Sequence, residues 1–162
     1  MQDMLVKLYE LPPEAALAAP RDESVRIRRA MAPDKLRVLE WVKEHSGRSA
    51  AGECDVCFAH TPISCFLATR GKQILGYACY NATAPDFFGP TRVLDEEQGS
   101  GIGKALLLRS LAAMRAEGYA YAIIGGVGPQ EFYAKCVNAV LIPGSNPGIY
   151  RDFLGGMREP TE

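Results

Sequence analysis

The chain has 162 residues, 48% of them apolar, and this size and composition predict a single domain, residues 1–162, that buries a sizeable core. Lysine and arginine number 18 and aspartate and glutamate 19, so no strong overall field attracts nucleic acid or an anionic membrane. The N-terminus is unlike a signal peptide, and no apolar run approaches the roughly 18 residues of a membrane span. We therefore expect a cytoplasmic protein with no nucleic-acid or membrane partner.

The N-terminal part of the chain predicts two strands and a helix. Residues 4–9 favour an edge strand, and the proline-rich stretch 11–24 indicates a connector to the main domain. Polar and apolar residues alternate at 25–28, which is typical of a strand. Pro33 suits a first helical turn, and the helix is expected to end at Gly47. Its apolar residues recur at three-residue steps, at Leu36, Leu39 and Val42.

The middle of the chain predicts an irregular segment and then a hairpin. Residues 48–62 show no clear periodicity. Strand-forming residues dominate 64–69 and 73–82, and the connection between them contains Gly71, so an antiparallel hairpin is expected. The following residues, 83–90, read as a loop.

The C-terminal part predicts strands and helices in alternation. A short strand at 91–94 precedes a glycine-rich helix that ends before Gly118, and an apolar strand is expected at 119–124. A second helix is predicted at 129–138. Two late strands are expected, at 140–142 and 149–154. This order suggests a mixed sheet with helices on its faces.

Five cysteines, an odd number, are expected to remain reduced thiols: Cys54, Cys57, Cys65, Cys79 and Cys136. Cys54 and Cys57, with His60, offer three metal ligands. No second cysteine pair or histidine pair completes a tetrahedral set, so we expect no metal and small apolar roles for the cysteines.

Glycines alternate where the predicted strand passes into the helix, at Gly99, Gly101 and Gly103. Backbone N–H groups can approach a bulky anion there, and the helix N-terminus adds partial positive charge. The segment therefore predicts a phosphate or pyrophosphate site. A P-loop needs glycine where the chain has Gln98 and serine or threonine where it has Ala105, and the dinucleotide fingerprint also fits poorly.

The pattern Gln98-x-x-Gly101-x-Gly103 resembles the Arg/Gln-x-x-Gly-x-Gly/Ala signature of the GNAT superfamily of acetyltransferases. The resemblance runs from about Val25 to Leu154 in element order and includes Gly-Ile-Gly-Lys-Ala-Leu-Leu and Phe132-Tyr133. Leu-Tyr-Glu-Leu-Pro-Pro near the start and Tyr-Ala-Ile-Ile-Gly-Gly later are similar to a small bacterial branch. The resemblance implies an α/β (α+β) fold: a mixed, mostly antiparallel sheet with helices on both faces and a splayed cofactor cleft.

The resemblance also implies that the chain binds acetyl-CoA. The pyrophosphate would be held by backbone N–H groups of Gln98, Gly99, Ser100, Gly101, Ile102, Gly103 and Lys104. The backbone of Val93 and Leu94, where the strand splays from its neighbour, would pair with the pantetheine arm. One of these two residues would also offer an N–H to the oxyanion that develops during acetyl transfer.

Acetyl transfer to an amine needs a neutral amine and a proton for the departing thiolate. Tyr133 matches the tyrosine that commonly protonates the CoA sulfur in this family, so the resemblance implies that it is the general acid. A core tyrosine is the alternative reading. Asp86, before the cofactor strand, and Glu53, in the irregular segment, are candidates for the base or else solvated carboxylates.

Two segments depart from the usual family pattern. Residues 125–128 are Gly-Gly-Val-Gly, where many members carry an asparagine that contacts the pantetheine arm. Residues 136–139 are Cys-Val-Asn-Ala in place of a frequent Gly-Phe. The acceptor would be chosen by the loops at 48–62, 83–90 and 143–148, which do not spell out an amine class.

We therefore expect an N-acetyltransferase that moves the acetyl group of acetyl-CoA to a primary amine of a small molecule or peptide by direct attack. The alternative is a non-catalytic CoA-binding sensor or regulatory module without turnover. The presence of Tyr133 favours the enzyme. The sequence leaves open whether two copies form a homodimer.

Overall fold

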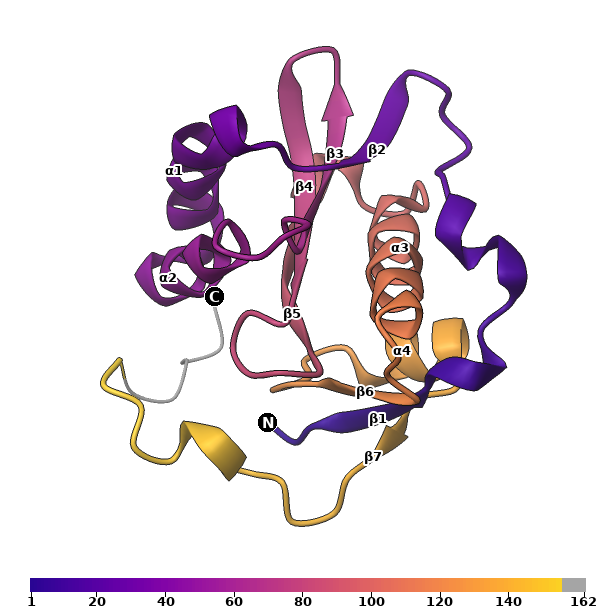
Figure 1. Ribbon diagram of the computed structural model, residues 1–162, viewed down its shortest axis with the longest axis vertical. Helices are drawn as coiled ribbons and strands as arrows, with labels where there is room; N and C mark the ends of the chain where they lie inside the picture. The colour runs from indigo at the N-terminus through magenta and orange to yellow at the C-terminus, as the bar shows by residue number, and fades with distance from the viewer. Residues whose placement is uncertain (156–162) are drawn as a thin grey trace.

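The computed structural model of the protein describes residues 1–155, in which seven strands form one sheet with the order β2-β3-β4-β5-β6-β1-β7 (Figure 1). The strands are β1 (Met4–Lys7), β2 (Val25–Arg29), β3 (Cys65–Arg70), β4 (Gln73–Tyr80), β5 (Phe87–Val93), β6 (Tyr121–Ile124) and β7 (Val140–Leu141). The helices are α1 (Lys35–Ser46), α2 (Arg48–Cys57), α3 (Ile102–Ala116) and α4 (Gln130–Val137). Only β5 and β6 are parallel neighbours among the described strands, so the predicted mixed, mostly antiparallel sheet is confirmed.

Alternation along β3 and β4 sends side chains into two separate cores. Phe66 and Ala78 belong to the larger core, which α3 and α4 cover. Leu67 and Tyr77, on the other face, belong to a smaller core with α1 and α2. The helices therefore lie on both faces of the sheet, as predicted and as Figure 1 shows.

The glycine-rich helix predicted from the sequence is α3, which has 15 residues. Its apolar stripe is buried to 1% exposure or less: Ile102, Leu106, Leu107, Leu111 and Met114. Burial of this stripe against the sheet fixes the N-terminus of the helix at the end of β5. Beyond the helix, Gly118 has φ +103°, in the left-handed region, which explains why the helix stops there.

The segment 48–62, predicted to be irregular, instead begins with the ten-residue helix α2. Its buried face consists of Ala50, Cys54 and Cys57 at helical spacing. Such small side chains give little apolar periodicity, so the pattern does not stand out in the sequence. In α1, Leu36 is 71% exposed because three-residue steps drift around a helix with about 3.6 residues per turn.

Three predicted strands differ in place or kind. The strand at 4–9 is β1, which lies between β6 and β7 and not at an edge. The strand at 91–94 begins earlier, at Phe87, because a register shift in β4–β5 accommodates Gly89 and Pro90. The prediction of a strand at 149–154 is wrong. Residues 148–150 form a 3₁₀ turn after Pro147, which has no N–H for a sheet.

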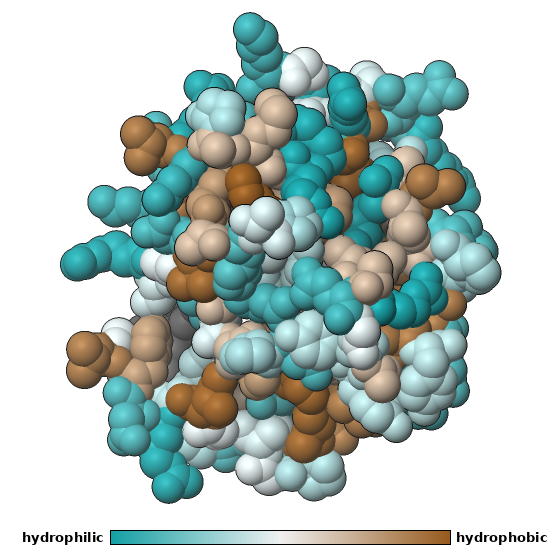
Figure 2. All heavy atoms as spheres, in the orientation of Figure 1, coloured by the Kyte–Doolittle hydropathy of each residue, from teal (hydrophilic) through white to brown (hydrophobic). Residues whose placement is uncertain are grey.

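The surface is mixed in character. On the face drawn in Figure 2, hydrophobic residues form separate small groups among hydrophilic ones, as on the ordinary surface of a folded domain. Among residues 1–155, no helix combines the length and apolar character that crossing a membrane requires.

Candidate functional site

The glycine-rich turn leads into α3 with backbone N–H groups that no side chain caps. Gly99 and Gly101 have φ values of +84° and +90°, which favour glycine. Gly101 is the N-cap of α3, and its C=O accepts the N–H of Ala105 at 3.0 Å. The N–H groups of residues 102–104 therefore lie at the positive end of a long helix without intrahelical partners.

The space in front of this turn is open. A Cβ at Gly99 would meet no atom within 4 Å, and one at Gly101 would meet only Pro20 Cα, at 3.9 Å. The Ser100 hydroxyl donates a hydrogen bond to the Glu97 carbonyl at 2.7 Å and so holds the turn in shape. A pyrophosphate has both room and donors here.

Val93, the last residue of β5, and Leu94, the residue after it, direct their backbone N–H and C=O groups to opposite sides. The N–H of Leu94 donates to the C=O of Leu75 in β4 at 2.9 Å. Val93 lies opposite Gly76 in the antiparallel ladder. Because the bond from Leu94 to Leu75 joins the residues next to them, Val93 and Gly76 form no hydrogen bonds with each other. The N–H and C=O of Val93 therefore point away from β4. The Gln98 side chain donates to this C=O at 3.3 Å.

β5 and β6 pair over only two residues before they part. Phe87 lies opposite Ile123 and Phe88 opposite Ile124, after which β6 ends while β5 continues to Val93. A pocket of about 620 Å³ opens beside this point, among β5, α2 and the C-terminal part of the described chain. Much of its wall is apolar or aromatic and includes Val56, Phe88, Pro90, Ile149, Tyr150 and Phe153.

Of the two carboxylates predicted as base candidates, Glu53 lines this pocket and Asp86 does not. Glu53 lies on α2 and accepts a hydrogen bond from the Thr83 hydroxyl at 2.8 Å. Asp86 precedes β5, and its C=O accepts the N–H of Ile123 at 2.9 Å. Burial raises the pKa of Asp86, whose Oδ1 has no hydrogen-bond partner among the described residues. A second carboxylate of the pocket wall is Asp152.

Tyr133 lies in α4 beside a ring of the pocket wall. Its ring centroid is 6.3 Å from that of Phe88 and 5.1 Å from that of Phe132, both edge-on. The side chain is buried. Burial, with a smaller contribution from Cys136, raises the pKa of Tyr133 to about 12. The hydroxyl is therefore protonated at neutral pH and can donate a proton.

Asp3 and Tyr150, which no sequence pattern singled out, contact the Gly125-Gly126 segment in the same region. The Asp3 carboxylate accepts the N–H of Gly126 at 2.8 Å and ties the loop after β6 to the N-terminus. A Cβ on Gly125 would lie 2.9 Å from both the Phe87 ring and the Tyr150 hydroxyl. Only glycine fits there without a shift, and no local pattern reveals this because the clash is with distant residues.

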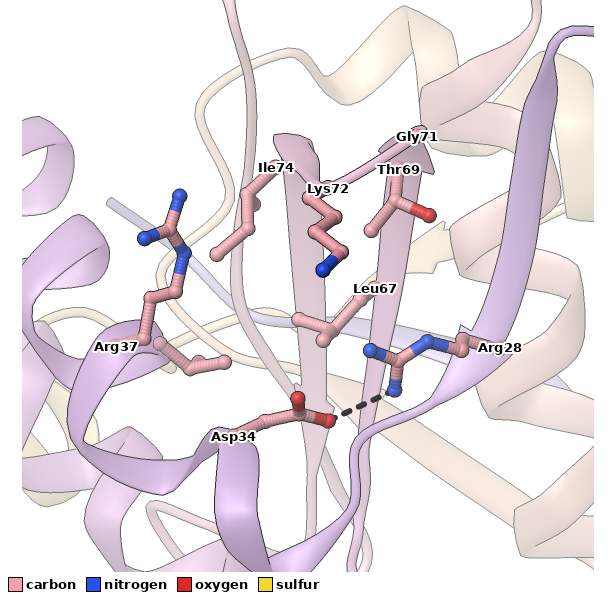
Figure 3. A pocket seen from close by; sticks show the side chains of 9 residues that line it. Arg28, Asp34, Arg37, Leu67, Thr69, Gly71, Lys72 and Ile74 are labelled. Atoms are coloured by element: carbon pink, nitrogen blue, oxygen red, sulfur yellow. Dashed lines mark hydrogen bonds and ion pairs between the residues drawn. The ribbon is translucent and has the colours of Figure 1, made fainter.

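A second hollow, of about 430 Å³, lies at the opposite end of β4 between α1 and the β3–β4 hairpin (Figure 3). Arg28, Arg37 and Lys72 line it. Figure 3 shows Arg28 paired with Asp34, an ion pair of 2.8 Å. Because its lining is basic and remote from the point where β5 and β6 part, it suits an ammonium group less well than the first pocket does.

Comparison with known proteins gives a family match and a shared fold. Residues 26–136 match the model of the acetyltransferase (GNAT) family. A search of curated proteins found no match. A glucosamine N-acetyltransferase region of a fungal multi-domain GH3 β-N-acetylglucosaminidase has a TM-score of 0.67 at 10% identity, covering 87% of this chain and 19% of that one. A GCN5-related N-acetyltransferase from Sphaerobacter thermophilus has a TM-score of 0.61 at 20% identity, covering 87% and 48%. The chain thus spans less than half the length of either structure, and at these identities the likeness shows the fold.

Proposed function

Because the chain belongs to the GNAT acetyltransferase family, whose model covers residues 26–136, we propose that it transfers the acetyl group of acetyl-CoA to a primary amine. The observation that carries the proposal is the parting of β5 and β6 after Phe88 and Ile124. β5 leads toward the uncapped N-terminus of α3, and three of its residues line the pocket that also holds acidic side chains. The gap would let a thioester on one side meet an amine on the other.

Acetyl-CoA fits two features of the chain. The N–H groups of residues 98–104 would hold the pyrophosphate, since Gly99 and Gly101 leave the approach open. The outward C=O of Val93 would accept a hydrogen bond from the pantetheine arm, whereas the N–H of Leu94 is already bonded to β4. When bound, acetyl-CoA supplies the acetyl group as an activated thioester.

We assign the 620 Å³ pocket to the acceptor amine. The carboxylates of Glu53 and Asp152 would attract an ammonium group, and the apolar wall would receive the hydrocarbon part of the molecule. An alkyl amine with a pKa of about 10.4 is only about one part in 2,500 neutral at pH 7, so a proton acceptor is needed. Glu53 lines the pocket and is the better candidate, directly or through water, and Asp86 is the lesser one.

Two further groups would complete the reaction. The N–H of Val93 points away from β4 and would stabilise the oxyanion. The hydroxyl of Tyr133, which is protonated at neutral pH, would protonate the sulfur of the leaving group. Tyr133 lies against Phe88, which lines the acceptor pocket, so its ring is close to the point where the strands part.

The test is a thiol-release assay with acetyl-CoA and a panel of polyamines, amino acids, aminoglycosides and peptide N-termini. We expect release of CoA that depends on one class of amine, with a matching acetylated product by mass spectrometry. Calorimetry should show acetyl-CoA binding more tightly than ATP or NAD. Tighter binding of ATP would overturn the proposal, and acetyl-CoA binding without turnover for any amine would favour the sensor.

A further inference from the structure

Four of the five cysteines meet in the smaller core, although they come from three elements. Cys54 and Cys57 lie on α2, Cys65 on β3 and Cys79 on β4. All four side chains are 0% exposed. The sulfur atoms of Cys54, Cys65 and Cys79 lie within 4.8 Å of one another. Cys57 lies about one helical turn after Cys54, and its thiol donates to the C=O of Tyr80 at 4.0 Å.

The sheet brings two of these cysteines together directly. Cys65 and Cys79 are opposite one another in the β3–β4 ladder. The N–H of Tyr80 donates to the C=O of Ser64 at 3.0 Å, so Cys65 and Cys79 form a pair without mutual hydrogen bonds, the kind in which side chains approach most closely. Both point to the face that α2 covers.

The α2 helix then places a third sulfur over this pair. Its buried residues Ala50, Cys54 and Cys57 all pack into the smaller core. No metal was expected from the sequence, because no second cysteine or histidine pair completes a tetrahedral set with Cys54 and Cys57. That second pair is Cys65 and Cys79, which only the sheet register makes adjacent. His60, the other ligand considered, instead faces the Ser64 hydroxyl at 2.9 Å.

We propose that Cys54, Cys65 and Cys79 bind a zinc ion as thiolates and that Cys57 leaves the C=O of Tyr80 to supply the fourth sulfur ligand. Zinc–sulfur bonds of about 2.3 Å place sulfur atoms about 3.8 Å apart in a tetrahedral site. The sulfur atoms of Cys54, Cys65 and Cys79 would therefore approach one another by about 1 Å at most. Each bound sulfur forms one bond to zinc and releases its thiol proton to solvent, and no electron is transferred.

Zinc in this position would also act on the proposed acceptor pocket. It would bond α2 to β3 and β4, and α2 carries Glu53, the residue before the ligand Cys54. The proposal does not depend on acetyl transfer, because metal binding is measured without substrate.

Because the cluster is fully buried, metal should be supplied during folding. The protein is denatured with a reductant and refolded with Zn²⁺ or with Co²⁺, in parallel with a chelator. We expect one zinc ion per chain by elemental analysis after gel filtration, and a sulfur-to-cobalt charge-transfer band in the near ultraviolet with Co²⁺. The zinc content of protein isolated directly from zinc-supplemented cells is a second measurement that needs no refolding.

Cys54→Ala is the ligand variant, and Cys136→Ala is its control because Cys136 lies on α4, outside the cluster. Zinc affinity in a chelator competition should fall by more than about 100-fold in the first and remain unchanged in the second. The proposal is overturned if the wild type takes up less than a tenth of an equivalent of zinc, if both variants bind zinc equally, or if mass spectrometry finds a Cys65–Cys79 disulfide after refolding with zinc.

Discussion

At the scale of single residues, Tyr133 can serve catalysis or packing, and removing its hydroxyl separates the two. Tyr133→Phe keeps the ring that packs against Phe88 and Phe132. We expect unchanged folding and acetyl-CoA affinity, with kcat lowered by about 10²- to 10⁴-fold, as for loss of a general acid. The measurement is kcat at saturating acetyl-CoA with the amine that the thiol-release screen identifies.

The raised pKa of Tyr133 also predicts how the rate depends on pH. Burial raises it to about 12, so the hydroxyl keeps its proton beyond pH 10, where an exposed tyrosine ionises. The wild-type rate should therefore show no loss with an apparent pKa near 10. A Tyr133→Phe variant within about threefold of wild type, far below the general-acid range, would return Tyr133 to the core and leave water as the proton donor.

Gly101 offers a test of the pyrophosphate site with a control on the same helix. Gly101 and Gly118 flank α3 and have φ values of +90° and +103°. Alanine at either position should cost about 1–2 kcal/mol of the free energy of unfolding, because both angles are unfavourable for a side chain. Only Gly101→Ala should weaken acetyl-CoA binding, by tenfold or more in calorimetry, because its Cβ stands where the anion approaches. Equal affinities in the two folded variants would refute the assigned site.

At the scale of elements, the junction after β6 depends on one close contact. The 3₁₀ turn at 148–150 brings the Tyr150 hydroxyl against Gly125, where a Cβ would lie 2.9 Å from it and from the Phe87 ring. Gly125→Ala should lower the free energy of unfolding by about 1–3 kcal/mol and raise the KM for the acceptor, since Tyr150 must move. Gly128→Ala is the control, because its Cβ would meet nothing within 4 Å. Urea unfolding and steady-state kinetics would show the difference, and two equally stable variants would contradict it.

Part of the fold was predictable from the periodicity of apolar residues and from glycines at helix ends and turns. The helix ending before Gly118 and the hairpin around Gly71 match α3, β3 and β4 closely. The prediction failed where the signal lies in the tertiary structure. α2 shows little periodicity because its buried face is made of small residues, and the strand predicted at 149–154 is a 3₁₀ turn.

The candidate site, too, was only partly predictable from the sequence. Glycines at the start of α3 point to an anion site by themselves, since backbone N–H groups and the helix dipole do the binding. The acceptor pocket is different because it joins α2, β5 and residues 146–153, which are remote in the chain. From the sequence, Glu53 and Asp86 were equal candidates for the base. Only the fold shows that Glu53, on α2, lines the pocket. No local pattern could reveal Tyr150 or the cysteine cluster.

At the scale of the whole molecule, residues 1–3 and residues 142–146 meet beside the proposed acceptor pocket. β1 is inserted between β6 and β7, so the N-terminal residues lie beside the loop after β6 (Figure 1). The Asp3 N–H donates to the Ser145 hydroxyl at 2.8 Å, and the Met1 amino group donates to the Asn146 side chain at 3.0 Å. The rim of the pocket therefore depends on contacts between opposite ends of the sequence.

Asp3 tests this arrangement because its backbone and side chain together join three segments. The backbone of Asp3 bonds to residues 142–145, while its side chain accepts the N–H of Gly126 at 2.8 Å and is largely buried. Asp3→Ala would leave that N–H without its acceptor, at an expected cost of about 1–3 kcal/mol in the free energy of unfolding. Asp3→Asn retains an oxygen acceptor and should recover most of this loss.

Because residues 125–126 and 146–153 line the pocket, the KM for the acceptor should rise in Asp3→Ala more than the KM for acetyl-CoA. Urea unfolding and kinetics with each substrate varied would measure both effects. Equal losses in the two variants would mean that the charge of Asp3, and not its hydrogen bond to Gly126, holds the rim in place.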